Sequence, residues 1–278
     1  MIGSHIDTVP NGGKYDGLTG VIAALEVLRV VEENDITLNN PIELVVFAEE
    51  EGSNFGTTMV GNKYISNKIG LEDLKSLYTD SDETAYDFIQ SKGFNFKERN
   101  DFPIDKNKDL SMIELHVEQG GVLDKEGMDI GVVEAIAGMN SVKVTLDGKS
   151  NHAGTTPMSM RRDPLLAASE IIYKIPDMLD ENGSSVATVG KITSIPNATN
   201  VISSSVTFFI DIRDVVQENI EKITNKINDL CVFVAGKNNV QASIELVGSS
   251  KVVKMNKKLV KTLENEAQKE GMKYKKMN

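Results

Sequence analysis

The stretch Ile42-Glu43-Leu44-Val45-Val46-Phe47-Ala48-Glu49-Glu50-Glu51-Gly52 carries the clearest fold signal in the chain. Residues 42–48 are apolar apart from Glu43, and they are bounded by Pro41 and by three glutamates. A short apolar run of this kind predicts a strand buried on both faces, as in a parallel sheet. Three carboxylates at the end of such a strand repel one another unless cations compensate their charge.

Two neighbouring segments place this strand in an α/β sheet. Residues 1–7 read as the end of a strand, and apolar residues at three-and-four spacing predict a helix over residues 17–33. Residues 111–116 form another apolar strand that ends in a histidine. Ligands of open α/β sheets bind at the edge where such strands end. The residues expected at that edge are His5, Glu50, Glu51 and His116.

The pattern changes after Gly138. Between residues 62 and 108 the chain is polar and turn-rich, with short helical segments, whereas from residue 141 strands alternate with helices. The predicted order is strand 141–146, helix 163–180, strands 187–195 and 205–212, helix 215–235, strand 241–247 and helix 255–271. This order predicts a small α+β sandwich with one open face.

We therefore expect an α/β fold with three parts. Residues 1–138 form a first, α/β domain, residues 139–250 form an inserted α+β sandwich, and residues 251–278 return to the first domain. The abrupt start in the last residues of a strand leads us to expect further chain before residue 1.

The composition narrows the class of partner. The chain has 278 residues and a net charge of −11 without a Lys/Arg tract, which argues against nucleic acid or a membrane surface. The single cysteine, Cys231, excludes an internal disulfide and fits a reducing compartment. Because neither a signal peptide nor a run of about 18 apolar residues is present, we expect a cytoplasmic protein with a small-molecule partner.

The chain has only three histidines, and all lie in polar, glycine-rich segments. His5 is followed by Asp7 and by Asp16 in a Gly-Gly-Lys-Tyr-Asp-Gly segment, where glycines let the backbone bend. Asp, Glu and His without a thiolate suit Zn²⁺, Mn²⁺ or Co²⁺. Of two adjacent carboxylates such as Glu50 and Glu51, one can bind metal while the other acts as a general base. Each residue alone would also fit an ordinary polar loop.

Six ordered motifs resemble those of the M20-type hydantoinase/carbamoylase family, which includes N-carbamoyl-L-amino-acid hydrolases, β-ureidopropionases and allantoate amidohydrolases. The motifs are Gly3-Ser4-His5-Ile6-Asp7-Thr8-Val9, Gly12-Gly13-Lys14-Tyr15-Asp16-Gly17, Glu50-Glu51-Gly52-Ser53, Leu115-His116-Val117-Glu118-Gln119-Gly120, Asn151-His152-Ala153-Gly154-Thr155-Thr156-Pro157-Met158, and Asn197 to Asn200 with Asp211-Ile212-Arg213. The fourth and fifth motifs discriminate best, because peptidases of the wider M20 group differ there.

The resemblance implies that residues 1–138 are an incomplete α/β/α catalytic domain, whose centre holds two divalent metal ions, Zn²⁺, Mn²⁺ or Co²⁺. By this resemblance, Asp16 would bridge the two metals. His5 and His116 would be the further ligands of one metal, and Glu51 would be a ligand of the other. Glu50 would be the general base that takes a proton from a shared water and delivers it to the leaving nitrogen. The implied reaction is hydrolysis of the carbamoyl or ureido C–N bond of a small carboxylate substrate.

The resemblance also implies a set of substrate contacts, namely Gln119, His152, Asn200 and Arg213. The planar fork of Arg213 suits a substrate carboxylate, and His152 with Asn200 can hold a developing oxyanion. A homodimer through residues 139–250, with this domain closing over the metal site, is implied as well. Whether His152 serves its own subunit or the neighbouring one stays open.

The chain departs from the family in three places. Family members carry an additional N-terminal stretch, and a C-terminal continuation whose late histidine completes the second metal site. We therefore expect a chain truncated at both ends, with an incomplete second site that retains Asp16 and Glu51, and with reduced activity. Asn54 stands where many relatives have arginine.

Two alternatives remain. A metal-dependent aminoacylase or peptidase shares the metal chemistry but cleaves an acyl amide. The second alternative is non-catalytic: the chain is an inactive split-gene fragment that acts as a dimerising, ligand-binding module around residues 139–250.

Overall fold

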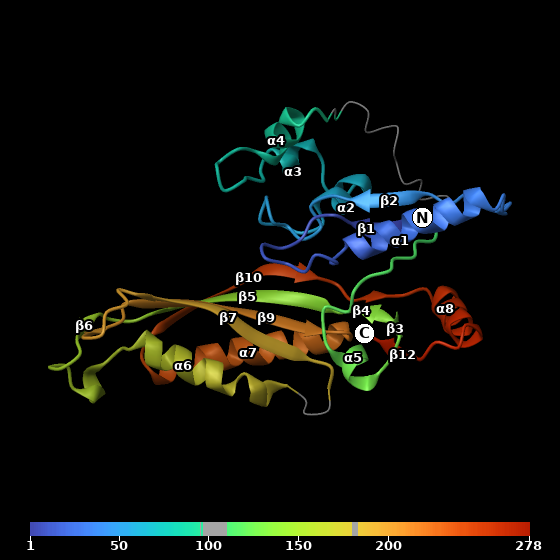
Figure 1. The fold of residues 1–278 in the computed structure, drawn as a ribbon. Coiled ribbons are helices and arrows are strands. Elements are labelled where there is room, and N and C mark those ends of the chain that lie inside the picture. The colour runs from blue at the N-terminus through green and yellow to red at the C-terminus, as the bar shows by residue number, and fades with distance from the viewer. Residues whose placement is uncertain (95, 97–109, 180–182) are drawn as a thin grey trace. The chain divides into compact units, whose positions relative to one another are not determined.

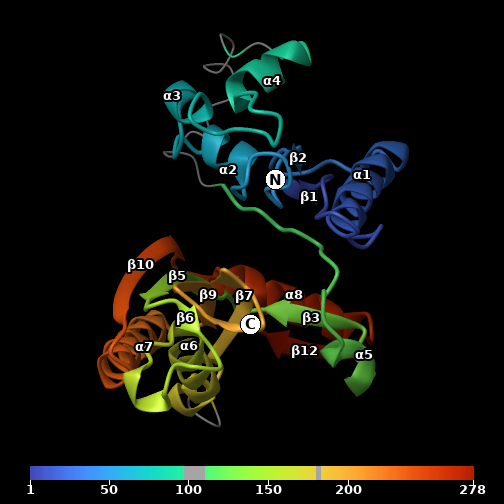
Figure 2. The same ribbon diagram turned by 90° about the vertical axis from the view of Figure 1, so that its left-hand side faces the viewer.

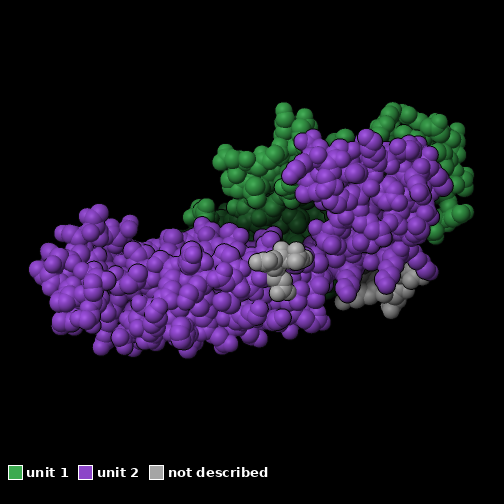
Figure 3. Space-filling view, turned by 90° about the horizontal axis from the view of Figure 1, so that it is seen from below, with its two compact units in different colours: residues 1–121 green, residues 122–278 purple. Residues whose placement is uncertain are grey.

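The fold was analysed in a computed structural model, which describes all residues except 95, 97–109 and 180–182. The chain divides into two compact units, Met1–Gly121 and Val122–Asn278, coloured green and purple in Figure 3. The predicted domain boundaries at residues 138 and 250 stay a prediction. The four-stranded sheet of the second unit is built from strands that lie between these two positions.

The first unit contains a parallel pair of strands with a helix between them in sequence. Strand β1 (Ile2–His5) pairs with β2 (Leu44–Phe47) from Ile2 opposite Leu44 to His5 opposite Phe47. Helix α1 (Leu18–Glu33) connects them and buries Gly20, Val21 and Ala24. The predicted strand, helix and strand are thus confirmed, and the parallel pairing brings the ends of both strands to the same edge.

The prediction that residues 42–48 form a strand buried on both faces was wrong. Strand β2 is only half-buried, and Val46 is 43% exposed. Among the described residues β2 has β1 as its one paired neighbour, so it is an edge strand. Its apolar composition therefore does not correspond to complete burial here.

The predicted strand over residues 111–116 was also wrong. Only Ile113 forms a bridge, parallel to Ile2, and the backbone N–H of Ile113 donates to the Met1 carbonyl at 3.1 Å. Further along, the segment runs close to α1: a Cβ built on Gly20 would lie 2.1 Å from the carbonyl oxygen of Leu115. Glycine at position 20, which has no side chain, allows this close approach.

The described part of the first unit also contains three short helices, α2 (Val60–Ile65), α3 (Leu71–Leu74) and α4 (Ala85–Ser91). They surround a small core of Phe55, Val60, Leu74 and Ala85. These helices agree with the short helical segments expected between residues 62 and 108, of which residues 95 and 97–108 lie outside the described residues.

The second unit is built on a four-stranded antiparallel sheet in the order β10-β5-β9-β7 (Figure 1). Its strands are β5 (Gly138–Asp147), β7 (Val186–Ile195), β9 (Ser205–Asp214) and β10 (Gln241–Ser250). Along β5 and β9 every second residue is buried, which is the period of a sheet covered on one face. The predicted strands of this part are confirmed, each within a few residues.

Helices α6 (Pro164–Lys174) and α7 (Gln217–Lys237) cover the same face of this sheet, as Figures 1 and 2 show. Phe208, Ile210 and Ile212 from β9 are fully buried beneath them. Helix α6 begins at its N-cap Asp163, whose carboxylate accepts from the N–H groups of residues 165 and 166.

The predicted extension of this helix to residue 180 was wrong, because the helix ends at Lys174. Pro176 lacks a backbone N–H and so cannot donate the next hydrogen bond of the α-helix. A separate 3₁₀ turn, η3 (Pro176–Met178), follows.

The remaining elements are small. Strand β6 (Asn151–His152) pairs with β8 (Val201–Ile202), and the 3₁₀ turn η2 spans Met158–Met160. Helices α5 (Val122–Glu126) and α8 (Lys257–Lys269) accompany the two-stranded pairs β3 (Ile130–Val133) with β12 (Tyr274–Met277), and β4 (Ala135–Ile136) with β11 (Val253–Lys254). The predicted helix over residues 255–271 is confirmed as α8.

Candidate metal centre

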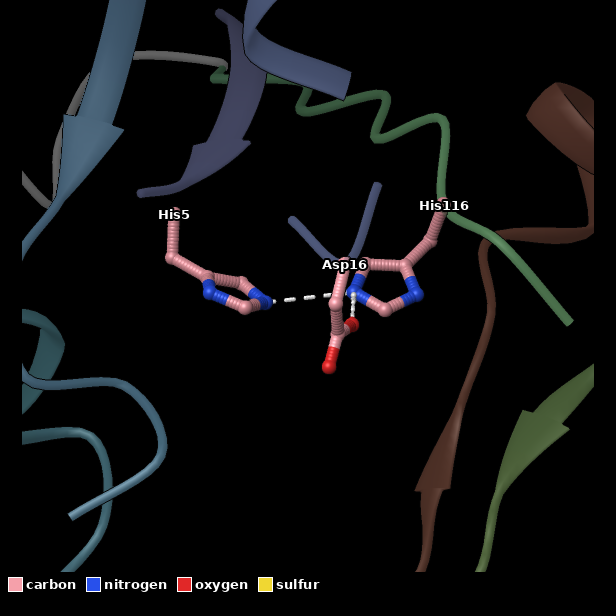
Figure 4. A group of neighbouring side chains, drawn as sticks. All are labelled: His5, Asp16 and His116. Atoms are coloured by element: carbon pink, nitrogen blue, oxygen red, sulfur yellow. Dashed lines mark hydrogen bonds and ion pairs between the residues drawn. The ribbon is translucent and has the colours of Figure 1, made fainter. Parts of the chain in front are cut away.

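Two imidazoles face each other in the first unit (Figure 4). His5 is the last residue of β1 and is 3% exposed, and His116 lies in the segment that begins at residue 110. Their Nε2 atoms are 3.1 Å apart. Nδ1 of His5 lies 2.8 Å from the carbonyl oxygen of Asp7, and Nδ1 of His116 lies 2.9 Å from that of Val117.

These contacts fix the tautomers of the two neutral rings. A carbonyl oxygen can only accept, so Nδ1 of each ring carries the hydrogen and Nε2 keeps its lone pair. The two lone pairs then point at each other across 3.1 Å, which is unfavourable unless a cation lies between them. This is the arrangement of imidazoles whose second nitrogen is oriented by a backbone carbonyl for metal binding.

Asp16 brings a carboxylate to the same place. It is 6% exposed, and its Oδ1 lies 3.3 Å from Nε2 of His116. The next residue, Gly17, has a φ of 64°, and a Cβ built there would lie 2.4 Å from Nδ1 of His5. Only glycine tolerates both the left-handed backbone and this approach, so Gly17 allows the loop before α1 to lie against the imidazole.

Glu50 and Glu51 follow the end of β2. His5, Glu50 and Glu51 form a second group whose possible ligand atoms lie within 4.8 Å of one another, like those of His5, Asp16 and His116. The backbone N–H of Glu51 donates to Oδ2 of Asp7 at 2.9 Å, which ties the two strand ends together.

Burial raises the pKa of both glutamates. For Glu50, desolvation is the main cause; the imidazoles of His5 and His116 oppose it, and the carboxylates of Asp7 and Glu114 add to it. For Glu51, desolvation is followed by the negative charge of Glu50. Carboxyl groups whose ionised form is disfavoured in this way are expected where a cation or a proton is to be bound.

The donor set fits a divalent metal ion. Two ligand atoms about 2.1 Å from a tetrahedral ion lie about 3.4 Å apart, close to the separations of 3.1 Å and 3.3 Å found here. Imidazole nitrogen and carboxylate oxygen are ligands of Zn²⁺, Mn²⁺ and Co²⁺. Among the described residues, these are the two groups of three or more such side chains that lie close enough for an ion.

Asp7, to which the sequence motifs gave no separate role, contacts both His5 and Glu51. Its Oδ1 is buried without a hydrogen-bond partner and lies 3.9 Å from Nδ1 of His5, while its Oδ2 holds the backbone of Glu51. The signal in the sequence was the spacing, since a residue two positions after a strand-end histidine lies on the same side of an extended chain.

Gln119 and Asp16 are also joined. The Nε2 of Gln119 lies 2.9 Å from Oδ1 and 3.0 Å from Oδ2 of Asp16. Sequence reasoning placed Gln119 among the substrate contacts and did not anticipate this hydrogen bond.

The other expected substrate contacts lie in the second unit. His152 on β6 is exposed, and its Nδ1 accepts from the N–H of Gly154 at 3.0 Å, so Nε2 carries the hydrogen in the neutral ring and has no hydrogen-bond partner among the described residues. The N–H of Ala153 donates to the carbonyl oxygen of Asn200 at 3.0 Å, which brings the His152 and Asn200 segments together.

Arg213 lies apart from this pair. It occupies the far end of β9, eight residues after Ser205, a separation of roughly 25 Å along a strand. Its guanidinium is 56% exposed and binds Asp211 at 2.7 Å and 3.2 Å. Within the second unit, His152 and Asn200 are therefore neighbours and Arg213 is not.

Comparison with known proteins agrees with this chemistry. The profile of peptidase family M20/M25/M40 matches residues 1–278. The chain is 38% identical over 269 residues to N-carbamoyl-L-amino-acid amidohydrolase of Pseudomonas sp. (strain NS671), covering 95% of this chain and 64% of that protein. It is 34% identical over 280 residues to allantoate amidohydrolase of Escherichia coli (strain K12), covering 100% of this chain and 67% of that protein.

Solved structures give the same result. A hydantoinase/carbamoylase family amidase from Burkholderia multivorans matches with a TM-score of 0.88 and 31% identity, over 99% of this chain and 66% of that one. The chain thus spans about two thirds of the length of these relatives. No helix among the described residues is long and apolar enough to cross a membrane.

Proposed function

Because the chain belongs to peptidase family M20/M25/M40, we propose that it hydrolyses the carbamoyl or ureido C–N bond of a small carboxylate substrate. The observation that carries the proposal is the pair of imidazole Nε2 atoms 3.1 Å apart beside Asp16, with two glutamates of raised pKa next to them. The names of the relatives, which include N-carbamoyl-L-amino-acid and allantoate amidohydrolases, support this substrate class.

We place two divalent ions, Zn²⁺, Mn²⁺ or Co²⁺, on the two groups of side chains. His5, Asp16 and His116 would hold one ion, and Asp16 with Glu51 would contribute to the second. Bound divalent ions polarise a carbonyl oxygen and lower the pKa of water.

Glu50 is the proposed general base. It takes a proton from the attacking water and returns it to the nitrogen that leaves, so one carboxyl group serves both halves of the reaction. Its raised pKa suits this cycle, because a stronger base takes the proton of the attacking water more readily and holds it until the leaving nitrogen accepts it.

Four residues are proposed to bind the substrate: Gln119, His152, Asn200 and Arg213. The planar guanidinium of Arg213 would exchange the carboxylate of Asp211 for that of the substrate. The free Nε2–H direction of His152, beside Asn200, suits the oxygen that gains negative charge during attack.

The second unit is proposed to act as a lid and dimerisation domain through residues 139–250. Helices α6 and α7 cover one face of its sheet, and no described helix of this unit covers the other face, which is compatible with a surface that closes over a substrate. Sedimentation of the 278-residue chain, compared at low and high protein concentration, tests the proposed homodimer.

The function is tested by supplying substrates to the metal-loaded chain. Release of ammonia from N-carbamoyl-L-amino acids, β-ureidopropionate and allantoate is measured with Mn²⁺, Co²⁺ or Zn²⁺. An N-acetyl amino acid and a dipeptide are tested in parallel, since an aminoacylase or peptidase of this family would cleave those instead. Turnover of a ureido or carbamoyl substrate supports the proposal, and turnover of the acyl amides alone contradicts it.

A further inference from the structure

The carboxylate of Asp16 is buried and has few hydrogen-bond donors around it. It is 6% exposed, and the amide Nε2 of Gln119 contacts both of its oxygens, at 2.9 Å and 3.0 Å. Nε2 of His116 lies 3.3 Å from Oδ1 of Asp16. Within the described part of the chain, no lysine or arginine forms an ion pair with Asp16. The carboxyl group of Glu51 also interacts with Asp16. Gln119 is the amide donor to this buried carboxylate, and a buried anion requires hydrogen-bond donors.

The direction of this contact follows from chemistry. An ionised carboxylate only accepts hydrogen bonds, so the amide nitrogen of Gln119, and not its oxygen, faces Asp16. Because the amide nitrogen contacts both oxygens, it restrains rotation of the carboxylate about the Cβ–Cγ bond.

The backbone of Gln119 is specialised for this contact. Its φ of 55° lies in the left-handed region, which residues other than glycine, asparagine and aspartate seldom occupy. Such a conformation persists where the surrounding structure holds it. Gln119 lies three residues after His116. One short segment therefore places both an imidazole and an amide donor against the carboxylate of Asp16, which lies about a hundred positions earlier in the sequence.

We infer that Gln119 is a positioning residue: its amide N–H holds the Asp16 carboxylate in the orientation that faces His116, and thereby sets the affinity of the site for a divalent cation. This inference rests on the metal centre of the proposed function and goes beyond substrate contact. Hydrogen-bond partners of metal ligands typically change metal affinity by about 10- to 100-fold when they are removed.

The test is the metal affinity of Gln119→Met, which keeps the length of the side chain and removes the donor. Binding of Mn²⁺ is followed by electron paramagnetic resonance of the free ion, and binding of Zn²⁺ by competition with a chelator. We expect affinity for both ions to fall by about 10- to 100-fold. Gln119→Asn, an amide shorter by about 1.5 Å, is expected to lose affinity as well, because it cannot reach Asp16.

Gln90→Met is the matched control, since Gln90 is an exposed glutamine of the same unit whose Nε2 donates to Tyr86 at 3.0 Å. It should bind metal like the unmodified chain. Circular dichroism of all variants checks that they fold, and Gln119→Asn retains a polar side chain should Gln119→Met fail to fold.

Affinities of both Gln119 variants within twofold of the unmodified chain would overturn the inference, and would leave Gln119 with substrate contact alone. This outcome is separable from failure of the proposed function. Loss of metal affinity in a chain that hydrolyses no ureido substrate contradicts the function and supports the inference, whereas an unmodified chain that binds no cation overturns both.

Discussion

Nε2 of His5 and Nε2 of His116 lie 3.1 Å apart, although 111 positions separate the two residues in sequence. Each ring is oriented by a backbone carbonyl on its Nδ1 side, so the short distance brings together two acceptors. Without a cation this geometry is repulsive, and with one it becomes a binding site. The predictions below start from this relationship.

Removing either of these imidazoles should abolish stabilisation by metal. A cation present at 100 times its Kd should stabilise the unmodified chain by about 2.7 kcal/mol, because it binds only the folded state. His116→Ala should lose this gain, which thermal unfolding with and without Zn²⁺ measures. His152→Ala, the exposed histidine of the other unit, is the matched control and should keep it. Equal stabilisation of His116→Ala and the unmodified chain would contradict the site.

Glu50→Gln should separate metal binding from catalysis. The amide is isosteric but cannot take a proton, so kcat should fall by about 10²- to 10⁴-fold while metal affinity changes little. Initial rates of ammonia release and a metal titration give the two quantities. Glu49→Gln, the adjacent residue, should retain activity. Comparable losses in both variants would argue against a specific base.

Gly17→Ala should weaken both the fold of the first unit and its metal binding. The φ of 64° costs a residue with a Cβ about 1–2 kcal/mol, and the new methyl would meet Nδ1 of His5 at 2.4 Å. Urea unfolding and a metal titration test this. Gly13→Ala is the control, because nothing lies within 4 Å of a Cβ there. If the two alanine variants behave alike, the approach of Gly17 to His5 is unimportant.

Asp214 should stabilise the second unit in a manner that depends on pH. It is 1% exposed and accepts from Ser184, Ser185, the N–H of Val216 and Asn219. Burial alone would raise its pKa, but these donors together lower it. The stabilisation is therefore present above the ordinary aspartate pKa and is lost as the pH falls through the lowered value in the folded state.

The variant Asp214→Asn tests this dependence. It should reduce the free energy of unfolding by about 1–3 kcal/mol at pH 7, and by less in acid, where the aspartate is itself protonated. Urea unfolding at both pH values measures it, with the exposed Asp147→Asn as control. A loss that does not change with pH would show that the ionised form is not what these donors stabilise.

Cys231 should resist thiol reagents until the second unit unfolds. The thiol is fully buried, and desolvation raises its pKa to about 12, so the reactive thiolate is scarce. Labelling with iodoacetamide should be slow in buffer and fast in denaturing urea. Rapid labelling without denaturant would contradict the burial of Cys231 in the core between helices and sheet.

The strongest periodicities predicted the elements that carry the fold. Helix α1 and strands β5 and β9 were recognisable because one stripe or one face of each is apolar and buried. Strand β12 was missed, since its sequence Tyr-Lys-Lys-Met shows no apolar alternation and its pairing with β3 is a long-range contact. Burial of β2 was overpredicted because composition does not reveal which edges of a sheet are covered.

For the candidate site, the sequence predicted that polar side chains near the strand ends would lie close together. The possible ligand atoms of His5, Asp16 and His116 do lie within 4.8 Å of one another. Their roles stay predictions. The hydrogen bond from Gln119 to Asp16 was not predictable, because it depends on a left-handed backbone at a residue other than glycine.

The most direct test of the metal centre is X-ray absorption spectroscopy of the chain loaded with one equivalent of Zn²⁺. We expect two imidazole nitrogens at about 2.0–2.1 Å, with carboxylate oxygen completing the ligand shell, and a single imidazole in both His5→Ala and His116→Ala. A zinc shell without imidazole, or one that neither substitution changes, would contradict the assignment of His5 and His116 as metal ligands.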